Sequence, residues 1–266
     1  MLKQRVLSAI VLVPLVAIPA WLGGWWFTGL VALLTALAVW ELGELLAKTG
    51  DKPMPYLSIP LAALLVLEGG LPANPQRLQL LLVAAVLIGL TVMLFRATAR
   101  PGNDWLLTLG AAVYLGMTMR FVALLRGLPA GLGWIIVAAL VTWITDSGAY
   151  FIGRSLGRHK LWPRVSPKKT WEGLLGGLAV GTLSSAILTP LLLPDLTWMH
   201  GVVIGVVIGV VGPLGDLSES VFKRQVSAKD SSNLIPGHGG FFDRIDSFFF
   251  VGPAVYILSL VFGLIN

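Results

Sequence analysis

The chain has 266 residues, of which 56% are hydrophobic and only 12% are charged, and its mean hydropathy is +0.85. A soluble domain typically carries about a quarter charged residues, so the composition excludes an ordinary soluble domain and indicates a polytopic membrane protein. The absence of cysteine excludes disulfides, iron–sulfur clusters and thiolate metal sites. The net charge of +6 is typical of basic cytoplasmic loops near anionic lipid, and we expect no nucleic-acid partner.

Apolar segments follow one another along the chain and predict an all-α integral membrane protein of about nine transmembrane helices, each needing roughly 20 mostly apolar residues. The third segment is short, as in a tilted or re-entrant helix, and the first is expected to be retained rather than cleaved. We expect one membrane domain over 1–266, with assembly helices in 1–130 and catalytic helices and loops in 131–266. The predicted helices span 6–22, 25–47, 55–68, 78–95, 104–124, 133–152, 171–193, 197–218 and 242–264.

The basic residues predict the orientation of these helices. With a cytoplasmic N-terminus and nine crossings, sixteen of the 19 lysines and arginines fall on the inner side, as the positive-inside rule requires. Only Arg77, Arg120 and Arg126 fall near the outer side. The C-terminus is therefore expected outside, and the basic loops 153–170 and 222–241 are expected at the cytoplasmic face.

Glycines recur at every fourth position in the seventh and eighth segments. Small residues at this spacing let helix backbones approach closely, so we interpret them as packing positions, within one chain or between two. They are Gly173, Gly177, Gly181, Gly201, Gly205 and Gly209.

The end of the eighth segment places polar groups on one helix face. Asp216, Glu219, Ser220 and Lys223 follow the spacing i, i+3, i+4, i+7, which brings side chains to the same side of a helix. Two carboxylates, a hydroxyl and an ammonium group at a membrane boundary favour a functional site. For Glu219 the alternative is a buried ion pair that ties helices together.

The ninth segment opens with two further acids, Asp243 and Asp246, one helical turn apart. Facing Asp216, they would form a cage of hard oxygen ligands, which suits Mg²⁺ because this ion takes carboxylates, waters and substrate phosphates. A second metal or a monovalent cation could join it. The alternative is that acids at a helix N-terminus only complement the helix dipole.

A glycine-rich turn, Pro236-Gly-His238-Gly-Gly240, precedes the ninth segment. Backbone N–H groups before a helix form a ready anion site, and Lys229 and His238 would add positive charge to phosphate oxygens. The alternative is an ordinary loop.

Further charged residues surround the basic loop 153–170. Asp146 lies inside the sixth segment, and the sequence leaves open whether it is a metal ligand, a nucleotide contact or a partner of a basic residue. Lys168 and Lys169 precede the seventh helix, which Thr170 is expected to cap, and they either hold an anion or only anchor the loop. Glu41 and Glu44 in the second segment are expected to be structural partners of basic groups rather than catalytic.

The pattern Ser220-x-x-Lys223-Arg224, Lys229-Asp230-Ser, His238-Gly-Gly and Asp243-Arg244-x-Asp246 resembles the C-terminal motif of the phosphatidate cytidylyltransferases, the CDP-diacylglycerol synthases. Supporting matches are Ser166-Pro-Lys-Lys-Thr-Trp-Glu-Gly and Gly215-Asp-Leu-x-Glu-Ser. The matches cover residues 145–247, whereas the first half resembles the family only in hydropathy.

The resemblance implies a Mg²⁺-dependent nucleotidyltransferase of phospholipid biosynthesis that converts CTP and phosphatidate into CDP-diacylglycerol and pyrophosphate. It further implies a multi-pass protein of a bacterial-type inner membrane, with the active site at the cytoplasmic face, and it favours a homodimer. The expected catalytic residues are Asp216, Asp243, Asp246, Lys223 and Arg244, the first three also as metal ligands. The expected substrate-binding residues are Lys168, Lys169, Arg224, Lys229, His238, Ser220, Asp146 and Glu219.

Three other functions remain open from the residues alone. Intramembrane acids are typical of a cation-coupled transporter, although the charges gather near one face and no inverted repeat is evident. A different membrane nucleotidyl- or phosphotransferase would share the cation site. A non-catalytic scaffold is the third alternative, and formation of a CDP-lipid would exclude the transporter and the scaffold.

Overall fold

The computed structural model of the protein describes residues 2–235, 237 and 239–263. It is 76% helical and 4% strand. Within the described residues, seven helical segments are long and apolar enough to cross a membrane, and two shorter apolar helices, Leu12–Leu22 and Pro55–Glu68, occupy the first and third positions. The predicted all-α, polytopic membrane fold is thus confirmed, while the orientation of the termini and the division at residue 130 stay predictions.

The chain divides into two units, and the boundaries fall within α5 and α8 and directly after α9. Unit 1 comprises residues 1–124 and 222–245, and unit 2 comprises residues 125–221 and 246–266. The helices assigned mainly to unit 1 are α1 (Leu2–Leu22), α2 (Gly24–Ala47), α3 (Pro55–Glu68), α4 (Pro75–Leu94), α5 (Pro101–Gly127) and α9 (Phe242–Ile245). The elements assigned mainly to unit 2 are α6 (Gly131–Leu156), β1 (Lys160–Trp162), β2 (Ser166–Thr170), α7 (Trp171–Leu192), α8 (Trp198–Gln225) and α10 (Phe248–Val261).

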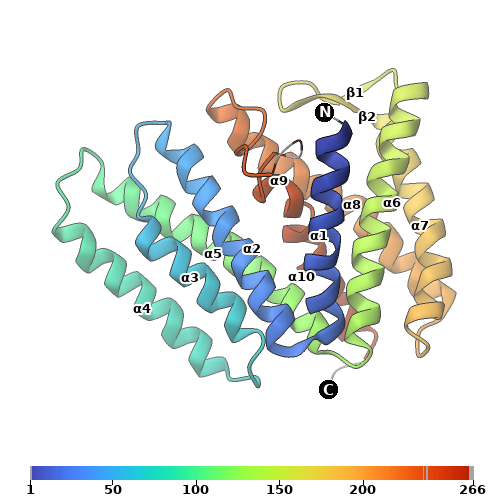
Figure 1. Ribbon diagram of the computed structural model, residues 1–266, viewed down its shortest axis with the longest axis horizontal. Coiled ribbons are helices and arrows are strands. Elements are labelled where there is room, and N and C mark those ends of the chain that lie inside the picture. Colours follow the sequence, from blue (N-terminus) through green and yellow to red (C-terminus); the bar gives the residue numbers. More distant parts are fainter. Residues whose placement is uncertain (1, 236, 238, 264–266) are drawn as a thin grey trace. The chain divides into compact units, whose positions relative to one another are not determined.

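In unit 1, α2 and α3 run side by side (Figure 1). Their buried side chains include Leu42, Leu45 and Leu65. By contrast, Gly89 is the one buried residue of α4, and the other residues of this apolar helix are at least partly exposed. Lipid tails can cover such a surface, because an apolar side chain costs nothing to expose in a bilayer.

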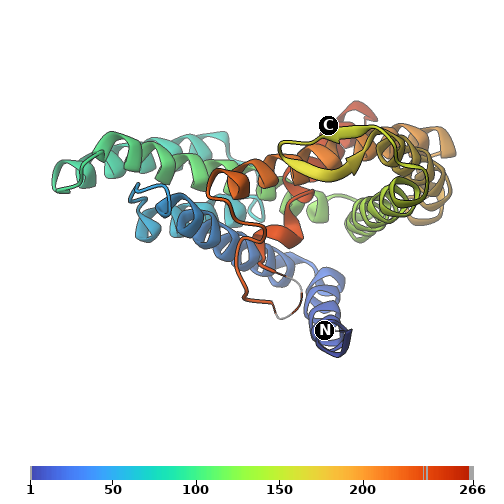
Figure 2. The same cartoon turned by 90° about the horizontal axis from the view of Figure 1, so that it is seen from above.

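In unit 2, α6 and α7 pack along their lengths, as both views of the ribbon show (Figures 1 and 2). Glycine allows this approach: a Cβ atom on Gly177 would lie 2.6 Å from the carbonyl oxygen of Thr145 and 2.8 Å from the Cβ of Ala149. The remaining glycines of the four-residue series also face neighbouring helix atoms closely. The prediction that they are packing positions is therefore confirmed.

The core of unit 2 is formed chiefly by α6, α8 and α10, with Leu125 at the end of α5. It includes Trp134 and Val141 of α6, Ile204 of α8, and Val251 and Val255 of α10, all buried. This core packs the first half of α8 against α6 and α10, the helices whose ends carry the charged motif.

The basic loop between α6 and α7 forms an antiparallel hairpin of β1 and β2. Glu172, in the first turn of α7, ties the hairpin down, since its carboxylate accepts hydrogen bonds from the backbone N–H groups of Arg158 and His159 and contacts the His159 ring at 2.6 Å. Thr170 caps α7 as predicted, because its hydroxyl oxygen accepts the N–H of Gly173 at 3.2 Å.

Candidate functional site

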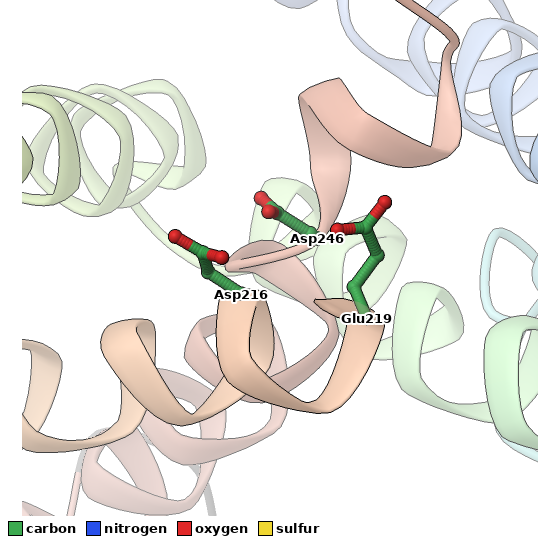
Figure 3. A group of neighbouring side chains, drawn as sticks. All are labelled: Asp216, Glu219 and Asp246. Atoms are coloured by element: carbon green, nitrogen blue, oxygen red, sulfur yellow. The ribbon is translucent and has the colours of Figure 1, made fainter. Parts of the chain in front are cut away.

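Three carboxylates of unit 2 form the main acidic cluster, Asp216, Glu219 and Asp246. One oxygen from each lies within 4.8 Å of the others. Figure 3 shows Asp216 and Glu219 rising from α8, with Asp246 between them on the segment that precedes α10. Glu219 is fully buried, whereas Asp216 and Asp246 are partly exposed.

Helix geometry and one glycine produce this cluster. Asp216 and Glu219 are three residues apart on α8 and therefore share a face. Gly215 lets the segment that precedes α10 come close to α8. A Cβ atom at position 215 would lie 2.5 Å from the carbonyl oxygen of Asp246 and 2.9 Å from the Cα of Ser247. Any larger residue at 215 would push Asp246 away from α8.

Positive charge reaches the cluster from the hairpin. Lys169 of β2 forms an ion pair with Asp216, with 2.7 Å between Nζ and Oδ2. Asp146 of α6 lies within electrostatic range of both of these side chains and is exposed. The hydroxyl of Ser220 donates to Asp216 at 3.3 Å. Six of the seven predicted site residues of unit 2, all but Lys168, thus lie at this cluster.

The donor set of the cluster fits a divalent metal. Three carboxylates at this separation repel one another, and one ammonium group offsets only part of the charge. Hard oxygen ligands are those that Mg²⁺ prefers. Asp216, Glu219 and Asp246 could therefore hold such an ion, with Glu219 in the place that the sequence assigned to Asp243.

Asp243 lies in unit 1, where protein donors surround its carboxylate. Lys223 donates to Oδ1 at 2.6 Å. Oδ2 accepts the N–H of Ser231 at 2.8 Å, the hydroxyl of Ser231 at 2.7 Å and the N–H of Gly240 at 2.9 Å. The side chains of Asp243 and Lys223 are only 6% and 10% exposed. This carboxylate organises the turn before α9.

Glu41 of α2, although far away in the sequence, binds the same turn. Its oxygens accept the hydroxyls of Ser231 and Ser232 and the N–H groups of Phe241 and Phe242, at 2.6 to 3.0 Å. The residue is fully buried. Glu41 is therefore structural, as the sequence indicated, but its partners among the described residues are hydroxyl and amide groups rather than basic side chains.

The glycine-rich turn was expected to offer its N–H groups to phosphate. In the structure the N–H groups of Gly240, Phe241 and Phe242 donate to the carboxylates of Asp243 and Glu41. Backbone N–H groups of this turn do bind anionic groups, but within the described residues these groups are carboxylates of the protein itself. His238, predicted to contact phosphate, lies outside the described residues.

The other predicted phosphate-binding residues are exposed on the surface of their units. They are Lys168 in unit 2 and Arg224, Lys229 and Arg244 in unit 1. Arg224 also donates to the carbonyl oxygen of Ala228 at 2.7 Å. Their exposure is consistent with contact to a water-soluble or headgroup phosphate.

Sequence reasoning undervalued Glu41. An acid within an apolar helix is expensive and usually has a function, and this signal was present in Trp40-Glu41-Leu42. The partner could not be found from the sequence, because 190 residues separate Glu41 from Ser231.

The comparisons with known proteins agree with the motif. Residues 3–262 match the cytidylyltransferase family. A phosphatidate cytidylyltransferase of Bacillus subtilis is 34% identical, over 98% of this chain and 99% of its own length. Proteins of the same name from Staphylococcus epidermidis and Staphylococcus aureus are 36% and 37% identical, each over 97% of this chain and 99% of its own length. With a match that spans nearly every residue, the chain belongs to the cytidylyltransferase family.

Proposed function

We propose that this protein transfers the cytidylyl group of CTP to phosphatidate, giving CDP-diacylglycerol and pyrophosphate. The family match and the names of the relatives support this reaction. The observation that carries the proposal is the cluster of Asp216, Glu219 and Asp246 with Lys169 beside it. Such a set suits a reaction in which two polyanions must meet.

The proposed chemistry is a substitution at phosphorus. A phosphate oxygen of phosphatidate forms a bond to the α-phosphorus of CTP, and the bond from that phosphorus to the bridging oxygen of pyrophosphate breaks. The nucleophile is already anionic at neutral pH, because the second pKa of a phosphate monoester is about 6. No strong general base is needed, and catalysis rests on positioning and charge neutralisation.

We propose that Asp216, Glu219 and Asp246 hold a divalent metal, expected to be Mg²⁺. When bound, this ion would neutralise phosphate charge and polarise the reacting phosphorus. Asp216 would orient Lys169 through their ion pair, and Ser220 would orient Asp216 in turn. Asp146 adds negative charge to the same region and would favour a cation there.

The basic residues of the motif would bind the phosphates of the substrates. We propose Lys168 and Lys169 in unit 2 for this role. In unit 1 the corresponding residues are Lys223, Arg224, Lys229, His238 and Arg244. Lys223 is oriented by Asp243, whereas the exposed arginines and Lys229 can follow a mobile headgroup.

The reaction requires a site that CTP reaches from water and phosphatidate reaches from lipid. We propose that the protein lies in a bacterial inner membrane with its N-terminus and charged loops in the cytoplasm, in keeping with the positive-inside rule. We further propose a homodimer, for which the exposed apolar helices leave room.

A direct assay tests the reaction. Purified protein in lipid vesicles is given CTP labelled at the α-phosphorus and phosphatidate, and we expect a labelled CDP-lipid that needs Mg²⁺ and disappears with EDTA. Diacylglycerol without phosphate and CTP labelled only at the γ-phosphorus are the controls, and neither should label lipid. If well-folded protein labels no lipid phosphate, the proposed function is wrong and a transporter becomes the better hypothesis.

A further inference from the structure

We infer that Glu41, in the second helix of the chain, is a positioning residue for the reaction, because its carboxylate holds Ser231, Ser232, Phe241 and Phe242, and the last two directly precede Asp243. This inference rests on the proposed function. It assigns a role in that reaction to a residue of the N-terminal half of the chain, outside residues 145–247, which carry the sequence motifs.

The contacts divide evenly between the two oxygens of Glu41. Oε1 accepts the hydroxyl of Ser232 at 2.6 Å and the N–H of Phe241 at 3.0 Å. Oε2 accepts the N–H of Phe242 at 2.8 Å and lies 2.8 Å from the hydroxyl oxygen of Ser231. Each oxygen thus meets one backbone N–H and one serine. Hydrogen bonds to a buried charged group are among the stronger ones in proteins.

These contacts continue to the motif. The hydroxyl of Ser231 also lies 2.7 Å from Oδ2 of Asp243, and Asp243 in turn holds the ammonium group of Lys223 at 2.6 Å. A serine hydroxyl has one hydrogen, so Ser231 links the two carboxylates by donating to one of them at a time. A shift of Glu41 would therefore displace Asp243 and Lys223.

The fit around Glu41 is tight. A Cβ atom at position 240 would lie 2.1 Å from the hydroxyl oxygen of Ser231 and 2.4 and 2.6 Å from the two oxygens of Glu41. Glu41 and Phe242 are both fully buried. The second glycine of the motif, Gly240, is thus required by the carboxylate that it faces, without a bound phosphate.

Glu41→Gln is the sharpest test, because the replacement keeps the shape of the side chain. In either orientation the amide NH₂ group faces a backbone N–H, of Phe241 or of Phe242, and two donors cannot bond. We expect faster amide hydrogen exchange at residues 240–242, measured by mass spectrometry on the full-length protein. We also expect kcat to fall by about 10- to 100-fold at saturating CTP and phosphatidate, normalised to folded protein.

Two matched variants separate positioning from general destabilisation. Glu44→Gln changes an exposed glutamate one turn further along α2. Glu68→Gln changes another buried glutamate of unit 1, whose partner is Arg120. Both should leave exchange at 240–242 and the normalised kcat near those of the wild type. The inference is overturned if Glu41→Gln behaves like Glu44→Gln, or if Glu68→Gln lowers the normalised kcat as much.

A second variant covers the case in which Glu41→Gln fails to fold. Ser232→Ala removes one of the four contacts, so exchange at 240–242 should rise by a smaller factor; wild-type exchange in this variant would then overturn the inference. Failure of the proposed function is recognised separately, because the wild type would then form no CDP-lipid. The exchange measurement would in that case decide by itself whether Glu41 holds this part of the chain.

Discussion

Two groups of acids in this protein differ in what surrounds them. In unit 1, the oxygens of Glu41 and Asp243 accept protein N–H, hydroxyl and ammonium groups. In unit 2, one oxygen each of Asp216, Glu219 and Asp246 lies within 4.8 Å of the others. The first group is surrounded by donors, whereas the second brings three carboxylates close together beside Lys169 and Ser220.

The contrast suggests different roles for residues of one motif. A carboxylate surrounded by donors fixes the backbone that supplies them, because buried polar groups must keep their partners. Carboxylates that face each other repel, and a cation relieves the repulsion. Asp243 and Asp246 are only three residues apart, yet they fall on opposite sides of this division.

The largest effect is expected from Asp216→Asn. Losing this carboxylate removes one charge of the cluster and the partner of Lys169, so we expect kcat to fall by about 10²- to 10³-fold with little change in Tm. CDP-lipid formation in vesicles measures the effect. Asp195→Asn, an exposed acid in the loop between α7 and α8, is the matched control and should keep full activity. An active Asp216→Asn enzyme would contradict the role proposed for the cluster.

A magnesium titration sharpens the comparison of Asp216 with Asp243. When the residual activity of Asp216→Asn is measured against Mg²⁺ concentration, the concentration needed for half-maximal rate should be higher than in the wild type by about tenfold or more. Asp243→Asn should leave that concentration near the wild-type value but lower Tm, because Lys223 and the turn lose their acceptor. If Asp243→Asn instead shifts the magnesium requirement, Asp243 is a ligand, as the sequence predicted.

The fold could be predicted well from hydropathy, since apolar length and glycine spacing are local properties of the sequence. The hairpin of β1 and β2 could not, because its strands are only three and five residues long. The limits of each helix could be predicted only approximately. For example, α5 begins at Pro101 rather than near residue 104, because proline suits the first turn of a helix.

The site could be predicted in part. Asp216 and Glu219 share a helix face, and periodicity is enough to show it. Asp243 and Asp246 also have the spacing of a shared face, but α9 ends at Ile245, so the helical argument does not extend to Asp246. The contact of Glu41 with Ser231 depends on tertiary structure, and no local pattern encodes it.

A glycine substitution would break the arrangement in unit 1. Gly240→Ala places a methyl group against Ser231 and Glu41, and we expect a loss of about 1 to 3 kcal/mol of unfolding free energy, measured as a lower Tm in detergent. Gly110→Ala on α5 is the control, since nothing lies within 4 Å of the added methyl group. There alanine should be neutral or stabilising by up to about 1 kcal/mol. Equal Tm values for the two variants would show that the contact is looser than described.

The smallest effect on stability is expected at Asp51, another acid of unit 1 whose carboxylate is surrounded by donors. It lies outside the membrane spans, and hydrogen bonds from Thr49 and Asn103, at 2.7 Å each, together with Arg100, hold its pKa below the ordinary value despite some desolvation. A lowered folded-state pKa means that its contribution to stability is complete above the unfolded-state pKa of about 3.9 and is lost as the pH falls through the folded-state value.

Asp51→Asn should therefore have a slightly lower Tm than the wild type at neutral pH, and the two Tm curves should converge as the medium is acidified. Thermal unfolding in detergent from neutral to acidic pH measures this difference. A constant gap between the curves would mean that Asp51 contributes through packing and not through its charge. Convergence would show that the donors around Asp51 stabilise its charged form and thereby fix the loop that carries it.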